Sequence, residues 1–165
     1  SITDGQIFLD GDLFNSGVRP AINVGISVSR VGGNAQIKAM KKVSGTLKLD
    51  QAQYRELEAF AKFGSDLDAS TQQLLNRGAK LTELLKQDQY SPMAVAQQVI
   101  AVFSGVRGFL DNVEQNNIKN IEKQIYEEVK SSSPDIIDSI NNTGKLEDEI
   151  DKKLTEVITK FKKNK

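Results

Sequence analysis

Arg30 is the residue of this chain whose type and position raise the clearest question of chemistry. It ends the apolar run "AINVGISVS", and two glycines, Gly32 and Gly33, follow closely behind it. A guanidinium is always protonated and presents a planar fork of N–H donors, which can bind two oxygens of one phosphate or carboxylate. From residue type alone, however, a structural salt bridge is the more common role of an arginine.

Most other catalytic chemistry is excluded by composition. The chain has no Cys and no His, which excludes disulfide scaffolds, thiolate zinc sites, thiol nucleophiles and Ser-His-Asp triads. No stretch matches G-x-x-x-x-G-K-[ST], the phosphate-binding P-loop. Charge is balanced, with 22 Lys plus Arg against 22 Asp plus Glu, which argues against general attraction to nucleic acid. Taken alone, this is a poor candidate for a complete enzyme.

The elements that must position Arg30 fall into two parts, residues 1–32 and residues 33–165. In the first part, "GQIFLD" and "AINVGISVS" each predict a short buried strand, with turn-forming residues between them. Two strands cannot make an independent core. We therefore expect residues 1–32 to be the edge of a larger sheet whose other strands lie elsewhere.

The second part has helical periodicity. Asp50 with Gln53 predicts a capping box at a helix start, and a later helix is predicted to stop at Gly78, before a short helix with three leucines. The loop before the helix that is predicted to stop at Gly78 contains "DLD" at 66–68. Asp is expected to cap that helix there and not to bind a metal.

The clearest helix is predicted in "SPMAVAQQVIAVFSGVRGFL", with Ser91 as the N-cap and Pro92 at the first helical position. Its apolar stripe is continuous and wide, which predicts a central position. Three more helices are predicted beyond it, with a turn at 141–144. Their apolar faces are formed by Ile118, Ile121, Ile125 and Val129, then Ile136, Ile137 and Ile140, then Leu146, Ile150, Leu154, Val157 and Phe161. No apolar stretch approaches the roughly 18 residues needed to cross a bilayer, and no signal peptide is evident, so we expect a soluble chain.

Three motifs together, "RPAINVG", "SVSRVGG" and "FGSDLD", resemble the alpha subunits of F-type rotary ATP synthases. The resemblance is close over about residues 1–110 and weakens to a shared helical pattern over 111–165. It implies a mainly α chain, a C-terminal helical bundle preceded by the last short strands of a P-loop α/β nucleotide-binding domain. The missing P-loop and the incomplete sheet are what such a fragment would have.

The resemblance also implies roles for two residues. Arg30 corresponds to the arginine finger that reaches across the subunit boundary to the nucleotide of the neighbouring beta subunit. We expect the glycines behind it to let the backbone turn sharply into the helical part. Ser27 corresponds to a position on which activity depends, although a hydroxyl that closes a local backbone contact is an equal alternative.

The resemblance also implies a second site, which binds the nucleotide that alpha subunits hold without turning it over. By position, Phe14, Arg19, Pro20, Gln87 and Gln89 would line the pocket for its base, with ATP or ADP and Mg bound in the intact complex. Pro and Phe offer apolar faces to a purine, and amides match its edge. Without the resemblance, both glutamines would be read as helix-terminus amides.

The implied function is that of a regulatory, non-catalytic subunit in proton-driven ATP synthesis and hydrolysis. The implied partners are beta subunits, other alpha subunits, the gamma central stalk and the delta or peripheral stalk. The implied location is the cytoplasmic face of a bacterial inner membrane or, as the alternative, the matrix face of the mitochondrial one. The alternative function is a stand-alone helical interaction module, which would be favoured if no P-loop domain were encoded upstream.

Overall fold

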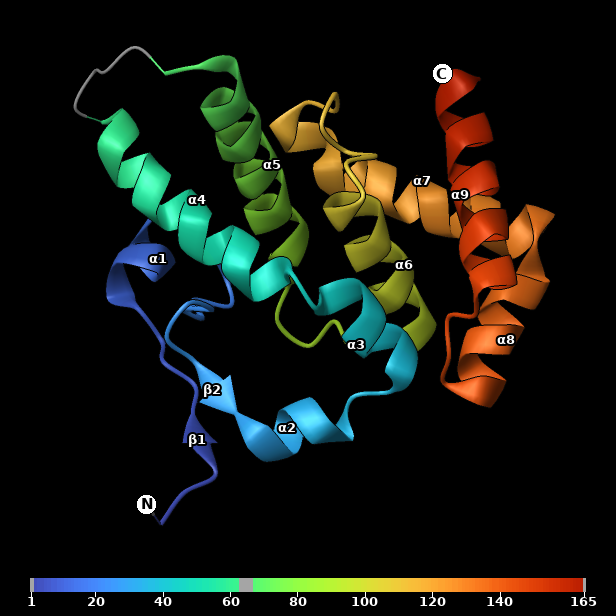
Figure 1. Ribbon diagram of the computed structural model, residues 1–165, viewed down its shortest axis with the longest axis horizontal. Coiled ribbons are helices and arrows are strands. Elements are labelled where there is room, and N and C mark those ends of the chain that lie inside the picture. Colours follow the sequence, from blue (N-terminus) through green and yellow to red (C-terminus); the bar gives the residue numbers. More distant parts are fainter. Residues whose placement is uncertain (1, 63–66, 165) are drawn as a thin grey trace.

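The computed structural model describes residues 2–62 and 67–164, and its helices pack side by side into a bundle (Figure 1). The elements before residue 62 are β1 (Gly5–Gln6), α1 (Gly11–Asn15), β2 (Val28–Ser29), α2 (Arg30–Ala35), α3 (Lys38–Ser44) and α4 (Leu47–Ala61). After residue 67 come α5 (Ala69–Leu85), α6 (Val95–Val106), the 3-10 helix η1 (Gln115–Asn117), α7 (Ile118–Ser132), α8 (Pro134–Thr143) and α9 (Asp148–Lys163). The prediction of a mainly helical chain with short N-terminal strands is confirmed.

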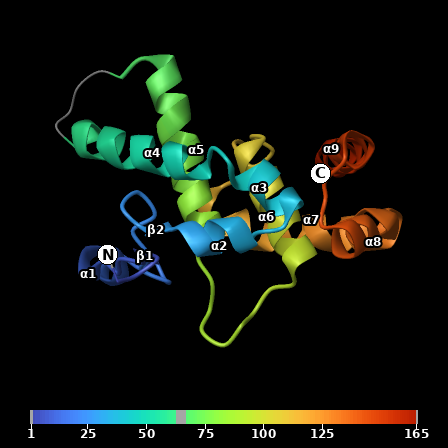
Figure 2. The same ribbon diagram turned by 60° about the horizontal axis from the view of Figure 1, so that its bottom comes forward.

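Helix α6 forms the centre of the core, as its stripe predicts. Eight of its residues are buried, and Val99, Ile100 and Phe103 are almost completely enclosed. Helix α7 buries Ile118, Ile121, Ile125 and Val129, so the face predicted from its periodicity is confirmed. Helices α8 and α9 lie at the end of the molecule away from β1 and β2 in both views (Figures 1 and 2).

The helix boundaries before α7 differ from the predictions in three places. Helix α4 begins at Leu47, three residues before the predicted cap, and Asp50 accepts a hydrogen bond from the Thr46 hydroxyl inside the first turn. Helix α6 begins at Val95 with the extended residue Ala94 before it, and residues 91–94 belong to no helix, so the predicted cap by Ser91 and the predicted first helical position at Pro92 are wrong. The third difference concerns Gly78.

Gly78 lies inside one continuous helix, α5, and does not end a helix. A Cβ atom built on Gly78 would lie 2.4 Å from Cβ and Cγ of Tyr54 on α4. The glycine is therefore present because two helix backbones approach closely there, which is the second common use of glycine besides the C-cap. Local sequence cannot separate the two uses.

Elsewhere the predicted cap at Asp68 agrees with the structure, but the turn predicted at 141–144 is shorter, because 141–143 are still helical, and α9 begins at Asp148, after the Leu146 that its predicted face included. Asp68 caps α5 by accepting a hydrogen bond from the Thr71 backbone N–H at 2.8 Å. Gly144 ends α8 with a φ of 65°, the left-handed conformation that glycine adopts without strain. Residues 63–66, which include most of the "FGSDLD" motif, lie outside the described residues.

The two strands are shorter and more exposed than predicted. β1 pairs with β2 in antiparallel register, Gly5 opposite Ser29 and Gln6 opposite Val28, and a single bridge joins Leu9 to Ile22. All four strand residues are exposed, so the expectation of buried strands is wrong. A two-residue ladder without a covering layer has nothing to pack against.

Candidate functional site

Arg30 is the first residue of α2, where the backbone on both sides is held by hydrogen bonds. The Ser29 hydroxyl accepts from the Gly32 N–H at 3.0 Å and donates to the Asp4 carboxylate at 2.8 Å. The same carboxylate accepts the Val31 N–H, with 3.1 Å to each oxygen. Asp4 and Ser29 thus cap the start of α2 and fix the peptide units that flank Arg30.

The Arg30 side chain itself is exposed and has no hydrogen bond or ion pair to any described residue. An arginine that serves an internal salt bridge would be partnered within its own chain. Within the part of the chain that the structure describes, Arg30 is instead presented to solvent at the start of α2, between peptide units that are held by hydrogen bonds. This placement is compatible with binding an anionic group from outside.

The glycines after Arg30 do not make the predicted sharp turn. Gly32 and Gly33 lie within α2, and neither has a positive φ. A Cβ atom on Gly32 would lie 2.8 Å from the Ser29 hydroxyl, so Gly32 lets its N–H approach the capping oxygen. Because α2 runs from residue 30 to residue 35, it also spans the boundary predicted at 32/33, and the division into two domains stays a prediction.

Ser27 has its hydroxyl engaged with the backbone. The hydroxyl donates to the Asn23 carbonyl at 2.6 Å and accepts from the Phe8 N–H at 3.0 Å. The Ser27 carbonyl in turn accepts from Nζ of Lys48 on α4, at 3.1 Å. These contacts are of the kind that the structural interpretation of Ser27 describes; a direct role in activity stays a prediction.

Three of the residues predicted to hold a nucleotide base lie together. The Arg19 guanidinium carbon is 3.9 Å from the centroid of the Phe14 ring, and Arg19 Nε donates to the Phe14 carbonyl at 3.4 Å. The Gln87 backbone N–H donates to the Arg19 carbonyl at 2.9 Å, which joins the loop after α5 to this pair. Pro20 follows directly and is exposed, as are Phe14 and Arg19.

The two glutamines differ in their side-chain contacts. The Gln87 amide donates to the Ser91 carbonyl at 2.7 Å, so one of its donors is occupied by its own loop. Gln89 is exposed and makes no side-chain hydrogen bond to any residue in the ranges 2–62 and 67–164. The structure therefore brings Phe14, Arg19 and Gln87 together and leaves Gln89 nearby in the same exposed loop.

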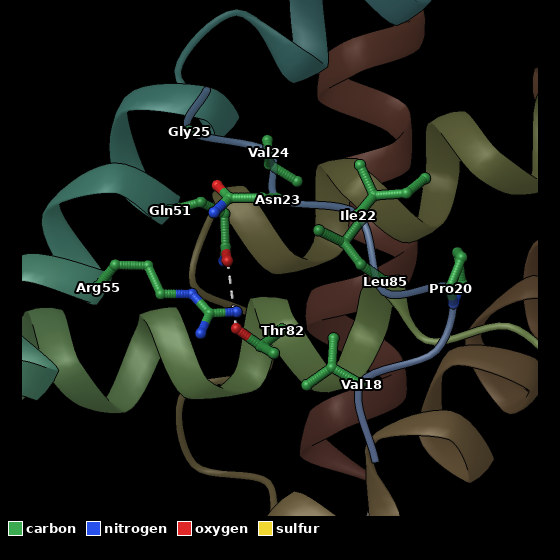
Figure 3. A pocket seen from close by; sticks show the side chains of 10 residues that line it. All are labelled: Val18, Pro20, Ile22, Asn23, Val24, Gly25, Gln51, Arg55, Thr82 and Leu85. Carbon is green, nitrogen blue, oxygen red and sulfur yellow. Dashed lines mark hydrogen bonds between the residues drawn. The ribbon is translucent and has the colours of Figure 1, made fainter. Parts of the chain in front are cut away.

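A separate cavity of about 150 Å³ lies between segment 18–25 and helices α4 and α5 (Figure 3). Of the predicted nucleotide-binding residues, it includes only Pro20. Its polar side chains come from Asn23, Gln51, Arg55 and Thr82. Sequence reasoning missed all four, since each is an ordinary helix or loop residue without a motif.

The carboxylate of Glu58 on α4 interacts with two neighbours on the same helix, Tyr54 and the cavity residue Arg55. Burial, followed by the nearby Glu58 carboxylate, raises the pKa of Tyr54, whose hydroxyl donates to Glu58 Oε1 at 3.2 Å. Glu58 Oε2 lies 3.9 Å from the Arg55 guanidinium, at the limit of an ion pair. Arg55 is therefore only weakly neutralised by its own helix.

Neither a metal cluster nor a membrane span is found in the described part of the chain. No group of three acidic side chains there is arranged to hold a metal ion. None of the helices described is both long and apolar enough to cross a bilayer.

Comparison with known proteins identifies the family. Residues 36–161 match the family model "ATP synthase alpha/beta chain, C terminal domain", so the match continues well past residue 110. The chain is 61% identical over 163 residues to ATP synthase subunit alpha of Mycolicibacterium smegmatis, and 60% identical to that of Mycobacterium sp. strain KMS. These alignments cover 99% of this chain and 30% of each relative, so the chain spans about 30% of the length of the curated relatives it matches. The chain belongs to the ATP synthase alpha/beta family, in its C-terminal domain.

Proposed function

We propose that this chain acts as the C-terminal part of an ATP synthase alpha subunit and that Arg30 is an arginine finger. In this role its guanidinium reaches the nucleotide bound by an adjacent beta subunit. The observation that carries the proposal is the contrast at Arg30, whose backbone is held by Asp4 and Ser29 while its side chain is exposed without a partner among the described residues.

The chemistry of the proposed role needs an arginine. Phosphoryl transfer spreads negative charge over the equatorial oxygens of the transferred group, and a planar fork can donate to two of these at once. A braced backbone reduces the entropy that is lost when the side chain is ordered in the transition state. Ser27 supports this arrangement as a positioning residue, because its hydroxyl and carbonyl fasten the segment leading to Arg30.

The same subunit is proposed to hold a nucleotide without turning it over. Phe14 and Arg19 stack to form a flat surface against which a purine can lie, with Pro20 beside it. Gln87 and Gln89 would offer amides to the edge of the base. The residues described thus fit the base end of ATP or ADP. The phosphates and Mg would need the P-loop part of the subunit, which lies outside this sequence.

The proposed partners follow from the same role. They are beta subunits, other alpha subunits, the gamma central stalk and the delta or peripheral stalk of a proton-driven enzyme. The complex would be peripheral to the cytoplasmic face of a bacterial inner membrane, in keeping with the bacterial relatives.

The finger role is tested by replacing Arg30 in the intact, assembled complex. We expect Arg30→Ala and Arg30→Lys to lower the ATP turnover number by about a thousandfold to a hundred-thousandfold, with nucleotide affinity changed far less. The matched control is Lys38→Ala, which removes an exposed cation at the first residue of α3, the next helix. Wild-type turnover in an assembled Arg30→Ala complex would refute the role.

A further inference from the structure

The cavity between segment 18–25 and helices α4 and α5 has two chemically different ends. Val18, Pro20, Ile22 and Leu85 form an apolar wall, and Asn23, Gln51 and Arg55 lie opposite, with Thr82 between them (Figure 3). The base-binding residues proposed above share only Pro20 with it. The cavity therefore adjoins the proposed base-binding residues at Pro20 but has its own lining.

Some hydrogen-bonding groups at the polar end are paired within the protein, and others have no partner among the described residues. The buried Gln51 amide donates to the Gly78 carbonyl at 3.4 Å, and its oxygen accepts from the Thr82 hydroxyl at 3.2 Å, so this side chain is occupied. The Asn23 side chain makes no hydrogen bond to another described residue. Donors at this end are thus available from Asn23 and from Arg55.

The charge of the lining is positive. Arg55 is the one ionised side chain among the ten lining residues, and its ion pair with Glu58 is long, at 3.9 Å. A guanidinium has five N–H donors and prefers planar, two-oxygen acceptors such as carboxylates. The lining offers no acidic group to meet them.

The volume sets the size of the ligand. Apolar cavities of roughly 150 Å³ accommodate a benzene molecule. A ring of this size against Val18, Ile22 and Leu85 would place one substituent at the polar end. We propose that this cavity binds a small organic anion, a carboxylate on a benzene-sized apolar body, through Arg55 and Asn23.

Such a ligand would join three segments that are far apart in the sequence. It would contact the loop that carries Arg19 and Pro20, helix α4 through Arg55, and helix α5 through Leu85. Because a ligand that binds only the folded arrangement stabilises it, occupancy would hold segment 18–25 against the bundle.

Ligand-detected NMR with benzoate as the probe tests the site on the full-length subunit. We expect benzoate to bind the wild-type protein, and benzyl alcohol, its neutral analogue, to bind about tenfold more weakly. Arg55→Gln should weaken benzoate about tenfold and leave benzyl alcohol unchanged. The matched control is Lys123→Gln, which removes an exposed cation on α7 outside the cavity.

Two further experiments separate the contribution of charge to benzoate binding from that of shape. Val18→Phe fills the apolar end and should abolish binding of both compounds, while inorganic phosphate should not displace benzoate. Equal affinity of benzoate for wild type and Arg55→Gln, or displacement by an equal concentration of phosphate, would overturn the proposal. If a variant fails to fold, the comparison of benzoate with benzyl alcohol on the wild-type protein still decides it, because equal affinities would exclude an anion site.

Discussion

Replacing Gly78 by alanine should push helices α4 and α5 apart and destabilise the chain. A Cβ atom at Gly78 would lie 2.4 Å from both Cβ and Cγ of Tyr54, and the Tyr54 Cβ is attached directly to the α4 backbone. To reach even 3.0 Å, the shortest separation that real Cβ atoms show, the atoms must separate by 3.0 − 2.4 = 0.6 Å. A rotamer change cannot provide this, because Cβ does not move with χ1.

The expected size of the effect is the difference between two opposing contributions. Alanine inside a helix is favoured over glycine by roughly 1 kcal/mol. Overpacking of a rigid contact costs about 1–3 kcal/mol. The shift also weakens the hydrogen bond from the Gln51 amide to the Gly78 carbonyl, which crosses the same helix pair. The difference between the two contributions is a loss of about 0–2 kcal/mol. Because the weakened hydrogen bond adds to it, we expect a net loss in the upper half of that range, about 1–2 kcal/mol in the free energy of unfolding, or a fall in Tm of several degrees.

The same substitution at Gly105 is the matched control. Gly105 lies inside α6, and its added Cβ would lie 2.7 Å from Leu81 Cδ2 and 2.8 Å from Leu84 Cδ2. These methyl groups are the far ends of flexible side chains, which can rotate away. Gly105→Ala should therefore change the free energy of unfolding by less than about 1 kcal/mol. Urea unfolding followed by circular dichroism measures both variants, and Gly78→Ala proving as stable as Gly105→Ala would refute the reasoning.

Two further predictions concern charged groups. The Asp151 side chain on α9 is only 13% exposed and pairs with Lys42 at 3.2 Å and with Arg107 at 3.0 Å. Asp151→Asn should therefore lower the free energy of unfolding, measured by thermal unfolding, by about 1.5 kcal/mol. Asp148→Asn, at a side chain that is 93% exposed, should lower it by less than about 0.5 kcal/mol, and equal losses would contradict the prediction. Hydrogen bonds from the Ser70 hydroxyl and from the Thr71 N–H and hydroxyl lower the pKa of Asp68 to about 2, from 3.8. The stability that Asp68 contributes is therefore present above about pH 3.8 and is lost as the pH falls through about 2. Asp68→Asn should show no such pH dependence. An NMR titration of Asp68 with a midpoint near 3.8 would exclude the cap.

The helical core could be predicted from the sequence because burial on one face of a helix is a local property. Val99, Ile125 and Leu154 are buried at the positions that their periodic spacing predicts. Gly78 could not be predicted correctly, because its partner Tyr54 lies 24 residues earlier on another helix. The exposed strands were also missed, since an apolar run predicts burial without saying which layer covers it.

The candidate site could be predicted only as far as its residue types. Arg30 stands out by its position, and the resemblance to alpha subunits implies its role, which stays a prediction. The contact that holds it in place does not stand out: Asp4 lies 25 residues before Ser29 and in no motif, and although Ser29 falls within "SVSRVGG", nothing in that motif shows that its hydroxyl meets Asp4. The cavity lining is likewise invisible in the sequence, because segment 18–25 and helices α4 and α5 meet only in three dimensions.

The hydrogen bonds that join the candidate residues to the bundle are accepted by backbone carbonyls. This is why no sequence pattern indicates them. Lys48 of α4 donates to the Ser27 carbonyl, and the Gln87 N–H, just after α5, donates to the Arg19 carbonyl. Every residue type offers a carbonyl, so the acceptors impose no choice of side chain. The two attachments nevertheless belong to different helices. We therefore expect that a displacement of α4 from α5, such as Gly78→Ala would produce, changes the spacing between Ser27 and Arg19 unless the long Lys48 side chain absorbs it.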